Sequence, residues 1–362
     1  MQPKKVIQVL YSGLGGHGSV AYSLYFGSQN KVKFYMVYFG IENLNPNYVE
    51  LNQLHQIPYS TIVKKKGVDI ICWANFINCL RKEKPEIVLL HSITLIIPAL
   101  LFKWIFGCKL IAIEHNANQI KRKSEWWWTK IANRYCNKVV YLSSSYLNEV
   151  KMKIGRSFKA ENSLIIPNGI DIEKFKPIQP IYNSEMQIHH LFMHSRFNEF
   201  RDHETLLRAF ALLIEKHPTL KLVLAGDGVT KNLTEGLGRA LNLSHKIHFL
   251  GNISEEKIIL ELQRPIIFTY ASRAETMSTA IMQAMSCGVP IVATDIPGIN
   301  NLIKNGSNAF LYQPNDYQEL AEKIDFLMSH KLKRKELADA ARIYAQSNFS
   351  QEKMFTAYNS VF

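Results

Sequence analysis

The 362-residue sequence lacks the patterns that mark secreted, membrane-spanning or metal-dependent proteins. Its five cysteines form no C-x-x-C pair, so neither a disulfide framework nor a zinc site is predicted. No D-x-D motif or cluster of metal-ligand residue types occurs, and we expect no metal and no other cofactor. The most apolar window, residues 93–106, is too short to span a bilayer. Because no signal peptide precedes the first strand, a cytoplasmic location is expected.

The net charge of +13 lies entirely in the first half of the chain. Residues 1–177 contain 24 basic residues (Lys and Arg) and 11 acidic residues (Asp and Glu). Residues 178–362 contain 19 basic and 19 acidic residues. This asymmetry predicts that the first half faces something anionic, such as a lipid surface or a phosphorylated ligand. A non-catalytic basic protein that binds nucleic acid would also explain the charge. No recognised nucleic-acid motif is present, however, so we expect no nucleic-acid partner.

Apolar strands alternate with helical patterns along the chain, which predicts an α/β protein with two doubly wound parallel sheets. A Pro-Asn-Gly turn at 167–169 ends the last strand of the first half. We therefore expect domains at 1–171 and 188–346, joined by a linker at 172–187. The expected strands are 6–11, 33–37, 87–91, 109–114, 138–142, 163–166, 190–194, 221–225, 247–250, 266–270 and 291–294.

A glycine-rich turn, Ser12–Gly18, joins the first strand to a helix. Such turns let the backbone approach a phosphate at a helix N-terminus. An NAD-dependent oxidoreductase would need an acidic residue at the end of the next strand, and only Glu42 lies near that position. NAD is therefore disfavoured, although the oxidoreductase stays open as an alternative of another class.

The most informative stretch is residues 266–302, which predicts a strand, a polar loop, a helix and a second strand. In such units ligands bind beyond the carboxyl ends of the strands, where Glu275 lies. Arg196 and Arg201 follow the strand at 190–194 on a loop directed to the same crevice. Arginine binds phosphate with a bidentate fork, so two arginines and a helix N-terminus could offset the charge of a nucleoside diphosphate.

This stretch resembles the donor-site signature of retaining glycosyltransferases with the GT-B fold, in particular glycosyltransferase family 4. The resemblance rests on a Glu, seven residues, a second acidic position, and a small-Cys-Gly-x-Pro turn, represented here by Glu275, Gln283, Cys287, Gly288 and Pro290. Gln283 departs from the family's glutamate, and an amide offers a ribose diol one acceptor and a donor. The resemblance implies two Rossmann-like domains facing a central cleft, with a final helix, 347–362, packing back on the first domain.

The resemblance also implies a retaining, metal-independent transfer from a nucleotide-sugar, with UDP-hexose or UDP-N-acetylhexosamine preferred on family frequency. It assigns catalytic roles to Glu275, Arg196, Arg201 and His115. It assigns donor-binding roles to Gly15, Gly16, Thr276, Met277, Ser278, Gln283, Gly226 and Asn252.

A basic and tryptophan-rich segment, KRKSEWWWTK at 121–130, suits a membrane interface, since indoles favour the headgroup region and cations favour anionic lipid. We therefore expect a protein peripheral on the inner face of the cell membrane that extends a lipid-linked glycan. A soluble glycan acceptor stays open if this segment proves buried. The expected acceptor or membrane residues are Asn116, His91, Lys121, Arg122, Trp126 and Trp127.

Overall fold

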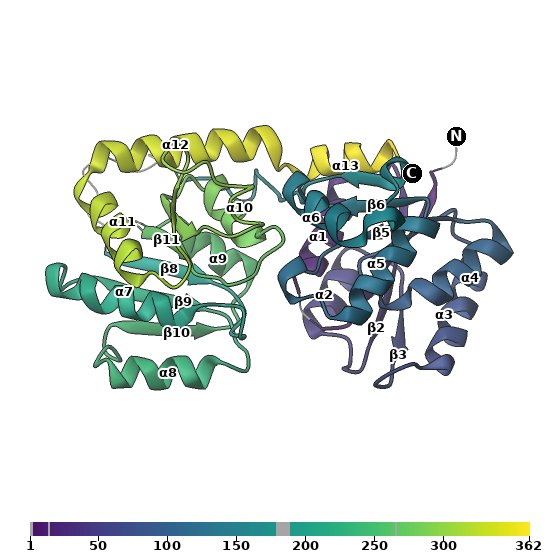
Figure 1. The fold of residues 1–362 in the computed structure, drawn as a ribbon, viewed down its shortest axis with the longest axis horizontal. Helices are drawn as coiled ribbons and strands as arrows, with labels where there is room; N and C mark the ends of the chain where they lie inside the picture. The colour runs from purple at the N-terminus through teal and green to yellow at the C-terminus, as the bar shows by residue number, and fades with distance from the viewer. Residues whose placement is uncertain (1–2, 14, 179–188, 265) are drawn as a thin grey trace. The chain divides into compact units, whose positions relative to one another are not determined.

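A computed structural model describes residues 3–13, 15–178, 189–264 and 266–362, which form two compact units (Figure 1). Unit 1 consists of Met1–Gly169 with Gln351–Phe362, and unit 2 of Ile170–Ser350. Part of the expected linker, 179–188, lies outside the described residues. The preceding residues pack on unit 2, where Phe175 is 2% exposed.

Unit 1 is built on a seven-stranded parallel sheet in the order β3-β2-β1-β4-β5-β6-β7. Its strands are β1 (Lys5–Tyr11), β2 (Lys33–Gly40), β3 (Tyr59–Val63), β4 (Ile87–Leu90), β5 (Lys109–Ile113), β6 (Lys138–Tyr141) and β7 (Ser163–Ile165). Its helices are α1 (Gly16–Gly27), α2 (Pro46–Leu54), α3 (Ile70–Glu83), α4 (Ile96–Phe106), α5 (Lys123–Tyr135), α6 (Ser144–Ile154) and α13 (Gln351–Asn359). The short strand β3 was not among the expected strands.

Side chains of β1 alternate between two cores, one on each face of the sheet. Ile7 and Val9 join a core with Phe76 of α3. Leu10 joins a second core with Tyr22 of α1. Helices therefore cover both faces of this sheet, as predicted for a doubly wound fold.

Unit 2 is built on a six-stranded parallel sheet in the order β10-β9-β8-β11-β12-β13. The strand β13 was not expected from the sequence. The strands are β8 (His190–His194), β9 (Lys221–Ala225), β10 (Ile247–Gly251), β11 (Ile266–Tyr270), β12 (Ile291–Thr294) and β13 (Phe310–Tyr312). The helices are α7 (His203–Lys216), α8 (Lys231–Ala240), α9 (Glu255–Leu262), α10 (Thr279–Ser286), α11 (Tyr317–Ser329) and α12 (Lys331–Asn348).

The strand order of each sheet reverses at one point, between β1 and β4 in unit 1 and between β8 and β11 in unit 2. Open α/β sheets bind ligands beyond the carboxyl ends of their strands at such a switch point. The loops that follow these four strands are therefore where a site is expected in each unit.

Candidate functional site

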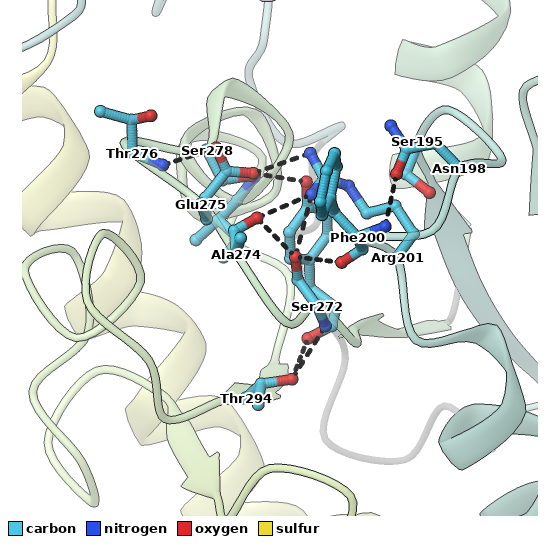
Figure 2. A network of polar contacts seen from close by, with 12 residues as sticks. Ser195, Asn198, Phe200, Arg201, Ser272, Ala274, Glu275, Thr276, Ser278 and Thr294 are labelled. Atoms are coloured by element: carbon cyan, nitrogen blue, oxygen red, sulfur yellow. Dashed lines mark hydrogen bonds and ion pairs between the residues drawn. The ribbon is translucent and has the colours of Figure 1, made fainter. Parts of the chain in front are cut away.

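Two loops of unit 2 pair with each other beyond the carboxyl ends of β8 and β11 (Figure 2). An isolated antiparallel bridge joins Arg201 to Ser272. The carbonyl of Phe200 accepts hydrogen bonds from the Arg273 amide at 2.8 Å and from the Ser272 hydroxyl at 3.0 Å. Segments that are 71 residues apart in the sequence therefore form one polar platform at the switch point.

Arg201 is the central residue of this platform, and its side chain is only 17% exposed. Its Nη1 donates to the Ser272 hydroxyl at 2.9 Å and to the Ala274 carbonyl at 3.0 Å. Its Nη2 donates to Glu275 Oε2 at 3.0 Å. The guanidinium thus holds the loop after β11 by three hydrogen bonds, one of which is an ion pair.

The Glu275 carboxylate accepts from three donors in all (Figure 2). The Tyr270 hydroxyl donates to Oε2 at 2.9 Å, beside Arg201. The backbone N–H of Thr276 donates to Oε1 at 3.0 Å. A carboxylate with three donors on its two oxygens is fixed in position, as a preorganised binding group must be.

Burial and charge set the ionisation of this cluster. Burial alone would lower the pKa of Arg201, but the neighbouring Tyr270 and Glu275 raise it above its ordinary value. Burial, followed by the charge of Arg201, lowers the pKa of His203 to about 4. At neutral pH the cluster therefore holds a charged arginine beside a neutral imidazole.

The start of α10 lies immediately after Glu275. Ser278 caps this helix by accepting from the Ile281 amide at 3.3 Å, and Thr276 and Met277 are both buried. Gly298 has a φ of +92°, and a Cβ at this position would lie 2.2 Å from the Glu275 carbonyl. The close approach of the loop after β12 therefore requires glycine there. Gln283, expected to meet a ribose, is 9% exposed within α10.

The other residues expected at a donor site lie on neighbouring loops of unit 2. Arg196 is exposed on the loop after β8, and Asn252 is exposed after β10. Gly226 has a φ of +125°, and a Cβ there would lie 1.9 Å from the Ser195 carbonyl. Gly226 is thus explained by the packing of the loop after β9 against the loop that carries Arg196.

Unit 1 has a cavity of about 420 Å³ that reaches the ends of β1, β4 and β5. The aromatic residues in its wall are of the kind that packs against sugar rings, and amide and carboxylate groups lie beside them. Residues of this wall include Tyr11, His17, Phe39, His115, Asn116 and Trp128.

His91 and His115 form a stacked pair in this cavity. Their rings lie 5.3 Å apart with an angle of 11° between them, and His91 Nδ1 lies 3.1 Å from His115 Nε2. Burial, followed by the charge of His17, lowers the pKa of His115 to about 3. Burial and then His115 and His17 lower the pKa of His91 well below its usual range. Both imidazoles are therefore neutral at pH 7.

The glycine-rich turn after β1 divides into packing positions and open positions. A Cβ on Gly18 would lie 1.9 Å from the Tyr48 hydroxyl, so glycine is required there for the contact with α2. A Cβ on Gly16 meets nothing within 4 Å, and Gly15 has an extended φ of −175°. Gly16 is thus not explained by packing, and Gly15 is not explained by backbone strain.

Lys121 does not lie on the surface, contrary to its expected contact with an acceptor or a membrane. Its Nζ lies 2.6 Å from Glu114 Oε2, with the two side chains 0% and 1% exposed. Thr129 donates to the other Glu114 oxygen at 2.8 Å. An ammonium enclosed in this way cannot reach a lipid headgroup, so the sequence interpretation was wrong for this residue.

The remaining residues of the basic and tryptophan-rich segment divide between core and surface. Trp126 is half-buried against the core of unit 1, whereas Trp127 is 53% exposed. Arg122 is exposed at the start of α5, where its amide donates to Glu125 Oε2 at 2.8 Å. Asn116 is also exposed and donates to Glu125 Oε1 at 2.8 Å.

Sequence reasoning missed three residues that shape these sites. Tyr270 was counted only as a strand residue, Gln8 only as part of the first strand, and Gly298 was given no role. Buried polar groups need hydrogen-bond partners, so the tyrosine that ends one apolar strand and the glutamine inside another were the available signals. Within the described ranges, no group of three or more His, Cys, Asp or Glu side chains is placed to hold a metal ion. The same ranges contain no helix that is long and apolar enough to cross a bilayer.

The chain is similar to known proteins in both fold and sequence. In solved structures, the chain is similar to Anabaena Alr3699/HepE in complex with UDP and glucose, with a TM-score of 0.84, 18% identity and 99% of each chain covered. It is 23% identical to an uncharacterized glycosyltransferase of Haemophilus influenzae over 62% of this chain and 61% of that protein. It is 24% identical to N-acetyl-alpha-D-glucosaminyl L-malate synthase of Bacillus anthracis over 53% of this chain and 49% of that protein. The chain thus spans about half to three fifths of the length of these curated relatives.

Two family profiles together account for nearly the whole chain. Glycosyltransferase Family 4 matches residues 14–174 and Glycosyl transferases group 1 matches residues 175–344. The two parallel-sheet units are those of the GT-B fold, as in the similar solved structures. The chain belongs to the group 1 glycosyltransferases of the GT-B fold.

Proposed function

We propose that this protein transfers a sugar from a nucleotide-sugar to an acceptor hydroxyl. The observation that carries the proposal is the Glu275 carboxylate, fixed by Arg201, Tyr270 and Thr276 at the switch point of unit 2. Fixed carboxylates are suited to accept hydrogen bonds from sugar hydroxyls. In this proposal Arg196, exposed on the loop that also carries Arg201, and the capped start of α10 would supply positive charge to the site.

We propose a UDP-sugar as the donor, in the form of a UDP-hexose or UDP-N-acetylhexosamine. Support comes from the similar solved structure that contains UDP and glucose. In this chain Gln283 would face the ribose, with its amide accepting from one hydroxyl and donating to the other. NAD lacks such support, because β2 ends at Gly40 without an acidic residue and only Glu42 lies near that end.

The proposed reaction retains the configuration of the sugar. The bond between the anomeric carbon and the diphosphate breaks, and the acceptor oxygen bonds to the same face of that carbon. The leaving phosphate takes the acceptor's proton, so no separate general base is required. Arg196 and the helix start would offset the charge that develops on the diphosphate, in the way a metal ion does in other transferases.

The proposed acceptor is a glycan carried on a lipid, bound by the cavity of unit 1, with the protein held on the cytoplasmic face of the membrane. Because Lys121 is enclosed and Trp126 is half-buried, the membrane contact proposed here is made by α4 instead. Exposed apolar side chains of α4 include Trp104, Ile105 and Phe106, at 60%, 68% and 49% exposure. The positive charge of the first half is complementary to anionic lipid.

A soluble acceptor is the second candidate. The curated relative from Bacillus anthracis carries L-malate in its name, which indicates a small soluble acceptor for that protein. The burial of Lys121 also removes one cation from the expected membrane contact.

Two measurements test the proposal. Calorimetric titration with UDP, GDP, ADP and NADH identifies the nucleotide, and we expect binding of UDP alone. Turnover of UDP-sugars, with NMR of the product's anomeric configuration, tests transfer and retention. Binding of NADH alone, or inversion of the anomer, would contradict the proposal.

Sedimentation with vesicles tests the membrane contact. We expect phosphatidylglycerol vesicles to pull down the wild type and to release a Trp104→Ser/Phe106→Ser variant. Met152→Ser is the matched control, because Met152 is also in unit 1 and is 78% exposed. Equal pull-down of all three proteins would show that α4 is not the membrane contact, and a wild type that does not sediment with the vesicles would favour the soluble acceptor.

A further inference from the structure

Gln8 is a buried amide in the middle of a strand, where an apolar residue is expected. It lies in β1 with no exposed surface, between β2 and β4 of the parallel sheet. An amide buried without partners costs a large free energy, so its hydrogen bonds must be satisfied. Its two polar atoms contact different elements, the helix α1 on one side and the residue after β4 on the other.

The orientation of the Gln8 amide is fixed by chemistry. Its Nε2 lies 3.1 Å from the Ala21 carbonyl oxygen of α1. A carbonyl oxygen can only accept, so the NH₂ group must face Ala21 and the amide oxygen must face the other way. That oxygen lies 2.8 Å from His91 Nε2.

The amide oxygen in turn fixes the tautomer of His91. Because Gln8 Oε1 can only accept, His91 must carry its proton on Nε2. A neutral imidazole has one N–H, so His91 Nδ1 is an acceptor. The His91 ring is buried, which disfavours its charged form.

The acceptor nitrogen of His91 fixes the tautomer of His115 in the same way. His91 Nδ1 lies 3.1 Å from His115 Nε2, and two acceptors would repel at that distance. His115 must therefore carry its proton on Nε2. Neutral His115 then has Nδ1 as its acceptor nitrogen, in a ring that lines the cavity of unit 1.

We propose that Gln8 is a positioning residue that sets the tautomer of His115 through His91, so that His115 acts in the cavity as a hydrogen-bond acceptor. The ligand class that matches this arrangement is a hydroxylated compound whose O–H donates to Nδ1. The identification of that ligand as the glycan acceptor rests on the proposed function. The tautomer chain itself does not, because it follows from contacts within unit 1.

Long-range ¹H–¹⁵N NMR of ¹⁵N-histidine-labelled protein tests the chain without substrate. His91→Asn and His115→Asn variants assign the signals. We expect both rings of the wild type to be protonated on Nε2. A wild-type His115 protonated on Nδ1 would overturn the proposal, whether or not any Gln8 variant folds.

Substitutions of Gln8 test the cause. Gln8→Met keeps the length of the side chain but removes the acceptor, so we expect His91 and His115 to lose their shared tautomer. Gln8→Glu keeps an oxygen for His91 and should keep the Nε2–H form. Asn52→Leu is the matched control, because Asn52 is a buried amide of unit 1 that bonds Tyr22 and Tyr38. Unchanged tautomers in Gln8→Met would overturn the proposal.

His17 is an internal standard within the same spectra. Its Nε2 lies 3.3 Å from the Tyr11 carbonyl, so its proton is held independently of Gln8. Its signals should stay in place in Gln8→Met. A parallel change in His17 would indicate a general disturbance of the cavity and would overturn the assignment of the effect to Gln8.

Steady-state kinetics separate this proposal from the proposed function. If both hold, Gln8→Met should raise the KM for the acceptor about tenfold, the loss of one hydrogen bond, while the KM for the donor stays constant. If the wild type has the expected tautomers but no transferase activity, only the proposed function is contradicted. If the wild type is an active transferase but its histidines are not protonated on Nε2, only the role of Gln8 is contradicted.

Discussion

The guanidinium of Arg201 and the carboxylate of Glu275 form an ion pair at 3.0 Å, with side chains 17% and 13% exposed. Both arginines of the loop after β8 were expected from the sequence to meet a diphosphate. In the structure Arg201 already donates to Ser272, Ala274 and Glu275. We infer that Arg201 holds Glu275 in place and that Arg196 is the arginine that meets phosphate.

Removal of Arg201 should affect both stability and turnover. Arg201→Ala leaves Glu275 partly buried without its cation, which should lower the free energy of unfolding of unit 2 by about 3 kcal/mol. Turnover should fall by at least about 100-fold, because the carboxylate loses its fixed position. Urea denaturation and steady-state kinetics measure the two effects.

The double variant Arg201→Met/Glu275→Gln separates the effect on stability from the effect on turnover. With both charges removed, we expect most of the lost stability to return while turnover stays low. Near-normal turnover in Arg201→Ala would contradict the role assigned to the pair.

Tyr270→Phe removes one hydroxyl from the Glu275 cluster. A hydrogen bond to a charged group contributes about 1.5 to 3 kcal/mol, so we expect kcat to fall by about 10- to 100-fold. Tyr312→Phe is the matched control, since the Tyr312 hydroxyl is also buried in unit 2 but bonds Thr294 at 2.8 Å. Equal losses in the two variants would show that any buried hydroxyl of unit 2 matters, not the contact with Glu275.

Arg196→Ala should weaken nucleotide binding without affecting stability. Because Arg196 is exposed, its loss should leave the free energy of unfolding within about 0.5 kcal/mol of wild type. The affinity for UDP should fall by about tenfold or more, the value of a charge-assisted hydrogen bond. Calorimetry measures the change.

Arg208→Ala is the control for charge alone. Arg208 lies on α7 of the same unit, is 44% exposed and pairs with Glu204 at 2.9 Å. It should bind UDP as the wild type does. If both variants lose affinity equally, the effect is long-range electrostatics and the placement of Arg196 at the phosphate is wrong.

The fold was predictable because its signals are local and repeated. The buried strands at 6–11, 87–91 and 266–270 stand out as short apolar runs between turns. The strand β3 was missed because only Ile62 of its five residues is buried, so its sequence has no continuous apolar run. An edge strand of this kind is defined by its neighbour β2 and not by its own pattern.

The site was predictable in position but not in connectivity. Strand ends and motif spacing indicated Glu275, Arg201 and His115. No sequence pattern could show that the N–H groups of Arg201 are hydrogen-bonded within unit 2, since their acceptors lie on a loop about 71 residues away in the sequence. Lys121 was misplaced for the same reason. A basic run usually lies in solvent, and only the fold brings the buried Glu114 to it.

The Lys121–Glu114 pair predicts a large loss of stability on substitution of Lys121 and almost none on substitution of its neighbour Arg122. Lys121→Met leaves the Glu114 carboxylate buried and unpaired, which should destabilise unit 1 by about 3 kcal/mol. Arg122→Ala, at an exposed position, should change stability by less than about 0.5 kcal/mol. Tryptophan fluorescence in urea follows unit 1 selectively, because all five tryptophans lie there. Equal stability of the two variants would contradict the buried pair.

The buried histidines predict a loss of stability in acid. Burial lowers the pKa of His194 to about 4, from 6.5 in the unfolded chain. Below about pH 6.5 the unfolded chain therefore binds a proton that the folded chain does not. This favours unfolding by up to about 1.4 kcal/mol per pH unit for each such group. The stability that neutral His194 contributes to the folded state is therefore fully present above pH 6.5. It decreases as the pH falls from 6.5 to about 4 and is constant below that pH.

His194→Phe isolates this effect in unit 2. The ring lies beside Phe192 and Phe268, so phenylalanine is compatible with its surroundings. Hydrogen exchange followed by mass spectrometry between pH 4.5 and 7 gives the opening free energy of each unit. The pH dependence of unit 2 should become shallower in the variant, while that of unit 1, which has His91 and His115, should stay the same. A wild-type unit 2 whose stability is constant over this range would contradict the neutral state of His194.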